Sequence, residues 1–147
     1  MFDQLLGRRL AGARRHGTSL ALLAIDLDGF KAVNDMHGHP AGDAVQKAAA
    51  SRISGLLRES DVVARLGGDE FAVLLDEVGL DDARHVASKL IDALSASYAG
   101  VVPAVSASVG IAMHPEGGRT LAELCKHADH ALYAAKRAGK RRAAVYP

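Results

Sequence analysis

The chain has 147 residues, of which 49% are hydrophobic and 24% charged, and it contains one cysteine and no tryptophan. This length suits a single globular domain, and the composition excludes a disordered chain; one cysteine excludes an internal disulfide and a cysteine-based zinc or iron–sulfur site. Lys and Arg number 18 against 17 Asp and Glu, a net charge of +1. This net charge is too small for electrostatic binding of nucleic acid, so we expect no nucleic-acid partner.

The first part of the chain predicts one buried strand between helices. Residues 2–16 place leucines on one stripe and arginines opposite, as an amphipathic helix does. Leu20–Ile25 is a continuous apolar run of strand length, which is typical of a strand buried on both faces, and Asp26 marks its expected end. A short helical turn is expected over Phe30–Val33.

A loop and a longer helix follow. Glycine and proline disfavour helix continuation, so the segment His37–Pro40 is expected to be a loop. Apolar residues at spacings of three and four between Ala44 and Leu57 then predict an amphipathic helix of about four turns.

A hairpin is expected after this helix. Val62–Leu66 and Phe71–Leu75 are short β-rich runs on either side of Gly67-Gly68-Asp69-Glu70, which has the composition of a hairpin turn. The two glycines permit positive φ, and they leave no side chain to obstruct a phosphate that approaches closely.

The last part of the chain predicts two helices that alternate with two strands. Asp and Thr are good helix caps, and a two-residue alternation of apolar side chains marks a strand. In chain order the elements are a helix capped by Asp81-Asp82 with inward residues from Ala83 to Leu94, a strand over Val105–Ile111, a helix capped by Thr120 that ends near Gly139, and an edge strand over Ala143–Tyr146.

This order of elements predicts an α/β (α+β) sandwich with a central mixed, largely antiparallel sheet flanked by helices. No apolar run approaches the roughly 18 residues that cross a bilayer, and the N-terminus lacks an export signal. We therefore expect a cytoplasmic domain without membrane contact of its own, even where a parent protein is attached to a membrane.

Charge is distributed unevenly along the chain. Four arginines lie at positions 8, 9, 14 and 15 and five basic residues between Lys136 and Arg142, whereas carboxylates gather at 26–43 and 59–82. Basic residues facing acidic ones indicate metal and phosphate chemistry, and the alternative is two ordinary solvated faces.

Carboxylates close to the first strand and in the hairpin turn are the main candidates for that chemistry. Asp26 and Asp28 share a face if the strand persists, although carboxylates at strand ends are also common helix caps. If the hairpin lies beside this strand, Asp26, Asp69 and Glu70 converge. Three such carboxylates repel one another unless a divalent cation lies between them, and oxygen ligands with phosphate select Mg²⁺ or Mn²⁺.

The run Arg65-Leu66-Gly67-Gly68-Asp69-Glu70-Phe71 resembles the signature of the GGDEF family, the diguanylate cyclases. The resemblance extends along nearly the whole chain, through the segments 26–31, 33–35, 37–43, 108–112 and 128–136. It implies a fold related to the palm of polymerases and adenylate cyclases. It also implies the condensation of two GTP molecules into cyclic di-GMP with release of pyrophosphate.

The resemblance also implies residue roles. Asp26, Asp69 and the backbone carbonyl of Leu27 would hold the metal, with Asp69 and Glu70 acting on the attacking 3′-hydroxyl and Lys31 neutralising charge at the phosphoryl group. The implied substrate contacts are Asn34 and Asp43 on guanine, Phe30 (through its main chain), Gly67, Gly68, Lys136 and Lys140 on the phosphates, and His39 nearby.

The assignments of Lys140 to the phosphates and of Asn34 and Asp43 to guanine differ in how far the sequence supports them. The family usually has Gly-Arg-Asn where this chain has Gly139-Lys140-Arg141, and a lysine grips phosphate without the bidentate fork of arginine. Asn34 and Asp43 would be read as turn and cap residues if the resemblance were absent.

Arg58-Glu59-Ser60-Asp61 is an Arg-x-x-Asp motif at the spacing of the family's inhibitory site for cyclic di-GMP. Arg58 and Asp61 would bind guanine there, and Lys89 aligns with a supporting arginine if the intervening loop has no gap. The alternative is an ion pair at a helix end.

The prediction is therefore a GGDEF domain over residues 1–147, a metal-dependent diguanylate cyclase that turns over as a homodimer. The alternative is a module that binds GTP or cyclic di-GMP without turnover. The family generally carries an Asp-x-Leu-Thr-Gly-Leu-x-Asn-Arg segment before the first helix, and this chain begins after that point. The resemblance thus implies a longer protein whose N-terminal sensor or dimerising region is missing here.

Overall fold

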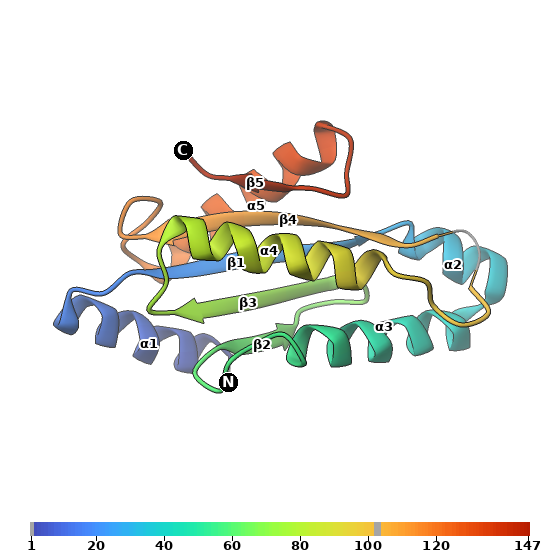
Figure 1. Ribbon diagram of the computed structural model, residues 1–147, viewed down its shortest axis with the longest axis horizontal. Helices are drawn as coiled ribbons and strands as arrows, with labels where there is room; N and C mark the ends of the chain where they lie inside the picture. Colours follow the sequence, from blue (N-terminus) through green and yellow to red (C-terminus); the bar gives the residue numbers. More distant parts are fainter. Residues whose placement is uncertain (1, 102–103) are drawn as a thin grey trace.

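The computed structural model describes residues 2–101 and 104–147 (Figure 1). Within them the helices and strands are α1 (Phe2–His16), β1 (Leu20–Asp28), α2 (Phe30–His37), α3 (His39–Ser54), β2 (Val62–Arg65), β3 (Glu70–Asp76), α4 (Leu80–Ser95), β4 (Ser106–His114), α5 (Leu121–Arg137) and β5 (Ala143–Val145). No helix among the described residues is long and apolar enough to span a membrane.

The strands form one sheet in the order β2-β3-β1-β4-β5. β1 lies at its centre and pairs antiparallel with both β3 and β4, and β2 pairs antiparallel with β3. Only the β4–β5 pair among the described strands is parallel. The mixed, largely antiparallel sheet predicted from the sequence is confirmed, and so is the position of the hairpin beside the first strand.

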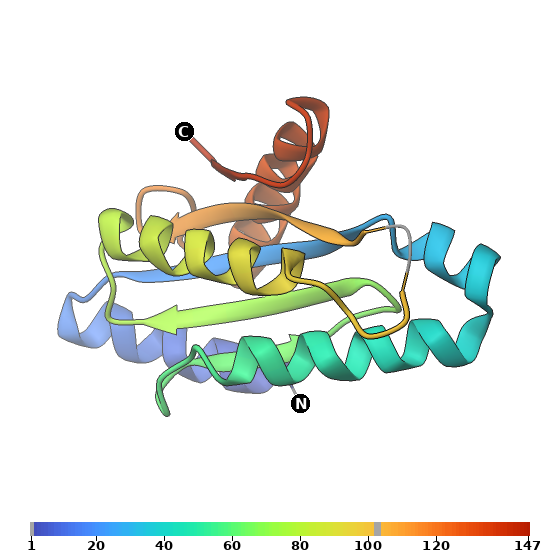
Figure 2. The ribbon, with the colours of Figure 1, turned by 45° about the vertical axis from the view of Figure 1, so that its right-hand side comes forward.

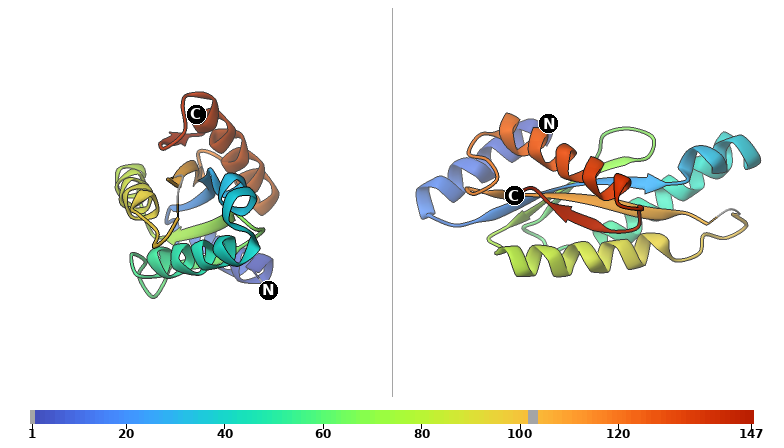
Figure 3. Two further views of the ribbon diagram at one scale, coloured as in Figure 1. Left: turned by 90° about the vertical axis from the view of Figure 1, so that its right-hand side faces the viewer. Right: turned by 90° about the horizontal axis from the view of Figure 1, so that it is seen from above.

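Helices cover both faces of this sheet (Figures 2 and 3). Alternate residues of β1 explain how, because Leu23 and Ile25 belong to the core beneath α2, α3 and α4, whereas Leu20 and Leu22 belong to a second core beneath α1 and α5. β1 is thus buried on both faces, as the run Leu20–Ile25 predicts, and it contributes side chains to both apolar cores.

Gly110 determines how closely α5 approaches the sheet. A Cβ atom at this position of β4 would lie 2.1 Å from the carbonyl oxygen of Ala128 and 2.2 Å from the nitrogen of Leu132, both in the backbone of α5. Only glycine permits this contact. The close approach brings the C-terminal half of α5 over the end of β1.

Several predicted boundaries were wrong. β1 continues past Asp26 to Asp28 because β4 pairs with it that far. The predicted loop His37–Pro40 does not form: Gly38 alone separates α2 from α3, and its φ of 86° makes the turn that a Cβ would resist. Pro40 is tolerated because the first turn of a helix needs no N–H there.

The helix caps were predicted with mixed success. α4 begins after Gly79, and Asp81 and Asp82 lie in its first turn instead of capping it. Thr120 does cap α5: its hydroxyl accepts a hydrogen bond from the Glu123 amide, and the Glu123 carboxylate accepts one from the Thr120 amide. α3 ends at Ser54, so Leu56 and Leu57 lie beyond the helix predicted to contain them.

Candidate active site

Asp26 and Glu70 face each other across β1 and β3. They are directly paired in the antiparallel register, so their side chains point to the same face of the sheet. Asp69 is held beside them, since its carbonyl oxygen accepts a hydrogen bond from the Leu27 amide at 2.9 Å. A hollow of about 260 Å³, lined in part by Asp26, Glu70 and Lys136, opens between this pair and α5.

Lys136 of α5 neutralises part of this charge. Its ammonium lies 2.5 Å from Asp26 Oδ2 and 3.7 Å from Asp28 Oδ1. Burial lowers the pKa of Lys136, but the three carboxylates of Asp26, Asp28 and Asp69 outweigh burial and leave it raised. Burial raises the pKa of Asp26; Lys136 opposes this and Asp69 adds to it, so the net direction is upward.

The donor set here fits a hard divalent cation. Asp26 Oδ1 is buried without a hydrogen-bond partner, and the neighbouring residues Asp69 and Glu70 offer carboxylate oxygens, which are the ligands that Mg²⁺ and Mn²⁺ prefer. Among the described residues, however, no group of three or more acidic, histidine or cysteine side chains is arranged to hold a metal. The predicted convergence of three carboxylates is therefore incomplete among the described residues.

Asp28 shares the face of Asp26 as predicted, but its carboxylate is already hydrogen-bonded to other residues of the protein. Its oxygens accept hydrogen bonds from the hydroxyls of Ser106 (2.8 Å) and Ser108 (2.9 Å) and from the Arg141 amide at 3.3 Å. Asp28 is 5% exposed. These contacts fasten β1 to β4 and to the segment that follows α5.

Gly67 and Gly68 do not adopt the positive φ that glycine permits. A Cβ at Gly67 would meet nothing closer than 3.9 Å, and one at Gly68 nothing closer than 3.3 Å. Neither the backbone conformation nor packing at Gly67 requires glycine there. The remaining effect of glycine at this position is that it leaves space in front of the turn, which a ligand can enter.

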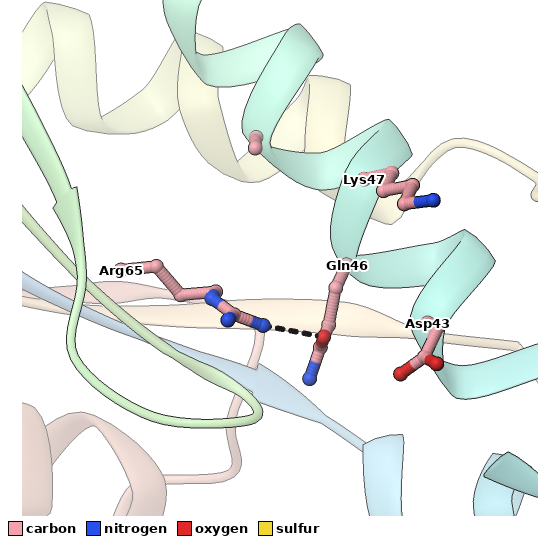
Figure 4. Close-up of a pocket in the computed structure, with 5 residues that line it drawn as sticks. Asp43, Gln46, Lys47 and Arg65 are labelled. Atoms are coloured by element: carbon pink, nitrogen blue, oxygen red, sulfur yellow. Dashed lines mark hydrogen bonds between the residues drawn. The ribbon is translucent and has the colours of Figure 1, made fainter.

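The predicted guanine contacts, Asn34 and Asp43, lie on the neighbouring helices α2 and α3. The side chain of Asn34 lies against the backbone of Gly42, where a Cβ would come 1.8 Å from Asn34 Oδ1, and this oxygen is buried without a partner. The next residue, Asp43, lines a hollow of about 430 Å³ (Figure 4). The structure thus places Asn34 against the residue that precedes Asp43, and of these two side chains only that of Asp43 lines the hollow.

The predicted phosphate contacts Phe30, Lys31 and Lys140 and the nearby His39 lie at the starts of α2 and α3 and after α5. Phe30 is the first residue of α2, whose N-cap Gly29 offers no side-chain hydrogen bond, so the first amides of the helix are without a side-chain cap. Lys31 is exposed in the same turn, and His39 is exposed at the start of α3. Lys140 is exposed in a left-handed turn after α5, with a φ of 65°.

The predicted inhibitory residues lie at the opposite end of β3. Arg58 Nη2 is 3.2 Å from Asp61 Oδ1, and Asp61 also accepts hydrogen bonds from the Arg58 and Asp76 amides. Asp76 and Glu70 are the two ends of one strand, about 20 Å apart at 3.3 Å per residue. Lys89 is exposed on α4, and the described residues show no contact between it and this pair.

Comparison with known proteins identifies the family. The sequence matches the family described as diguanylate cyclase, GGDEF domain, over residues 1–142. The chain is a GGDEF domain. It is similar to the diguanylate cyclase TpbB of Pseudomonas aeruginosa, with 47% identity over 140 residues, which are 92% of this chain and 32% of TpbB. The chain thus spans about a third of that relative's length.

Solved structures agree with the fold of this GGDEF domain. The crystal structure of the GGDEF domain of TpbB superimposes with a TM-score of 0.94 at 43% identity, covering 99% of this chain and 93% of that one. The GGDEF domain of DgcB from Caulobacter crescentus, in complex with c-di-GMP, gives 0.90 at 30% identity and covers 99% and 88%. The predicted family and fold class are confirmed.

Sequence reasoning missed two sets of residues around the site of this GGDEF domain. Ser106 and Ser108 bind Asp28, and their two-residue spacing on a predicted strand was a signal that both face one side. Gln46 contacts Arg65 and Gly68, and nothing in its position on an amphipathic helix indicates that contact.

Proposed function

We propose that this GGDEF domain is a diguanylate cyclase, which joins two GTP molecules into cyclic di-GMP and releases pyrophosphate. The observation that carries the proposal is the meeting of Asp26, the Asp69-Glu70 turn and Lys136 on one face of the sheet. Carboxylates beside a cation, with open space in front of two glycines, suit a nucleoside triphosphate and its metal ion.

Base recognition would come from Asn34 on α2 and Asp43 on α3. The Asp43 carboxylate accepts hydrogen bonds from the N1 and N2 donors of guanine, and the Asn34 amide contacts its N3 and N2 edge. Adenine lacks that donor pair, so it would leave the carboxylate unpaired. Asn34 Oδ1 is buried against Gly42 without a hydrogen-bond partner, so the side chain would have to turn away from Gly42 to contact the base.

The phosphates would lie between α2 and α5. The Phe30 amide and Lys31 bind from one side, and Lys136 and Lys140 from the other. Asp26, Asp69 and the Leu27 carbonyl would hold Mg²⁺ or Mn²⁺. When bound, the ion supplies positive charge that acidifies the 3′-hydroxyl and stabilises the phosphoryl oxygens. Asp69 and Glu70 then position this hydroxyl and accept its proton.

Turnover would require two domains. Each site accommodates one GTP, so two copies must bring their substrates together for the two phosphodiester bonds to form. We therefore propose a homodimer as the active species, and a slow or inactive monomer.

The test is incubation with Mg²⁺ and GTP followed by chromatographic separation of the products. We expect cyclic di-GMP and pyrophosphate, with Glu70→Ala reducing the rate at least a hundredfold. Glu59→Ala, an exposed carboxylate between Arg58 and Asp61, is the matched control and should retain the rate. GTP binding without any product in the dimeric protein would support the alternative function, a nucleotide-binding module.

Product inhibition is a second proposal, at Arg58 and Asp61. The Arg58 side chain is 56% exposed and within reach of a ligand, whereas Asp61 is 4% exposed and already accepts several hydrogen bonds. Guanine would therefore have to displace Arg58 from Asp61. Cyclic di-GMP that still inhibits Arg58→Ala as strongly as the unaltered protein would eliminate this site.

A further inference from the structure

One side chain of α3 holds the Gly67–Gly68 turn. Gln46 Nε2 donates a hydrogen bond to the Gly68 carbonyl, and Gln46 Oε1 accepts one from Arg65 Nη1 at 2.6 Å. Figure 4 shows Arg65 reaching Gln46 from the hairpin. A carbonyl can only accept and a guanidinium can only donate, so both ends of the amide are assigned by their partners. Gln46 thus binds residues on either side of Gly67.

The turn is also close to α2. A Cβ at Gly68 would lie 3.3 Å from Gln46 Nε2 and 3.7 Å from the Phe30 ring. The missing side chain therefore lets α2 and α3 approach the same peptide. Three segments far apart in the sequence meet at this point, and Gln46 supplies the hydrogen bonds that join two of them.

Gln46 lies one helical turn after Asp43. Residues three apart on a helix share one side, and both line the hollow between α3 and the hairpin. The rigid backbone of α3 therefore links the predicted base contact to the tethered turn.

We propose that Gln46 is a positioning residue that fixes the Gly67–Gly68 turn relative to Asp43, so that one GTP can occupy both ends of the site. This inference rests on the proposed function. Binding one end of a nucleotide makes binding of the other end effectively intramolecular, and this advantage is lost when the second contact point is free to move. Gln46 touches no reacting atom in this arrangement, and it acts through Gly68.

The test compares two substitutions of Gln46. Gln46→Leu keeps the approximate volume and removes both hydrogen bonds. Gln46→Glu keeps an acceptor for Arg65 but places a carboxylate oxygen against the Gly68 carbonyl, so it removes the tether and adds a negative charge. Dissociation constants are measured in Mg²⁺ for GTP by calorimetry and for guanosine by NMR titration. Hydrogen exchange of residues 67–70 reports on the tether without any nucleotide.

For both variants we expect GTP to bind about tenfold more weakly, the factor that corresponds to 1.4 kcal/mol, and guanosine to bind within about twofold of the unaltered protein. Exchange at residues 67–70 should become faster. Gln4→Leu, the same substitution at an exposed position of α1, should change none of these measurements.

Equal GTP affinities in all four proteins would overturn the role of Gln46 and leave the proposed function intact. Equal losses for GTP and guanosine would also overturn it, because they indicate general damage to the helix. An unaltered protein that binds no GTP would overturn the proposed function, and with it the role assigned to Gln46.

Discussion

The Lys136 ammonium lies 2.5 Å from the Asp26 carboxylate. In the proposed reaction the same carboxylate holds a divalent cation and the same ammonium binds phosphate. The two roles are compatible if the metal–nucleotide complex replaces the ion pair, so that Asp26 exchanges one positive partner for another. The pair then keeps a half-buried carboxylate neutralised before substrate arrives.

Lys136→Ala should affect metal and nucleotide in opposite directions. Without the competing ammonium, Mn²⁺ alone should bind about tenfold more tightly, whereas GTP in the presence of Mg²⁺ should bind about tenfold more weakly. Electron paramagnetic resonance measures free Mn²⁺, and calorimetry measures GTP. Lys126→Ala, on an exposed position of the same helix, is the control. Matching Mn²⁺ affinities in the two variants would contradict the exchange of partners.

Gly42→Ala should displace Asn34. The added Cβ would lie 1.8 Å from Asn34 Oδ1, which cannot be accommodated without moving that side chain. We expect GTP affinity to fall about tenfold. In Gly12→Ala, where a Cβ meets nothing within 4 Å, alanine's better helix propensity should raise the free energy of unfolding by up to about 1 kcal/mol. Calorimetry measures the GTP affinity, and urea unfolding measures the stability. Unchanged GTP affinity in Gly42→Ala would show that Asn34 does not contact the nucleotide.

Arg52→Ala should destabilise the whole domain. The guanidinium of Arg52 donates to the carbonyls of Ala93, Ala96 and Ser97 at the end of α4, and it stacks 3.9 Å from the Tyr98 ring centroid. We expect the free energy of unfolding in urea to fall by about 2–4 kcal/mol.

The control for Arg52 is Arg137→Ala. Its guanidinium lies 5.7 Å from the Tyr133 ring centroid at the exposed end of α5. The expected change is within about 0.5 kcal/mol. Comparable losses in the two variants would show that the contacts of Arg52 with α4 contribute no more than an exposed arginine does.

Glu123→Gln should reduce stability only above acidic pH. Hydrogen bonds from the Arg119 and Thr120 amides lower the pKa of Glu123 below 4.5. A lowered folded pKa means that the ionised carboxylate stabilises the fold above the unfolded pKa, and that this contribution is lost as pH falls through the folded pKa. Thermal unfolding between pH 2.5 and 7 should therefore show curves that separate as pH rises.

The control for this pH dependence is Glu116→Gln, an exposed carboxylate that makes no hydrogen bond among the described residues. Its unfolding temperature should follow that of the unaltered protein at every pH. A Glu123→Gln curve offset by the same amount at pH 2.5 and pH 7 would show that the cap acts without its charge.

Periodicity predicted most of the fold because it reports burial directly. The alternation and apolar runs in β1, β3 and β4 depend on which side of each residue faces a core, and both cores exist. Boundaries failed where tertiary pairing or turn geometry decides them: β4 extends β1 to Asp28, and a single left-handed glycine replaces the predicted loop before α3.

The carboxylates of the site were predictable because they surround one strand end and one turn. The register of β1 with β3 makes Asp26 and Glu70 direct neighbours, and the local sequence of either strand does not reveal this register. The partners of Asp28 and Gln46 depend on side chains that meet only after the sheet and helices have packed. The composition of the Gly67–Gly68 turn allows both positive φ and close approach of a ligand, and composition does not distinguish a glycine needed for conformation from one needed for space.

The central position of β1 bears on how the protein is made. Its first neighbour, β3, is synthesised more than 40 residues later, and its second, β4, is complete only at His114. Until then the nascent chain carries an apolar strand with unsatisfied edges, the kind of segment that aggregates or attracts chaperones. A translation product that ended before Ser106 would leave the β4 side of this strand unpaired.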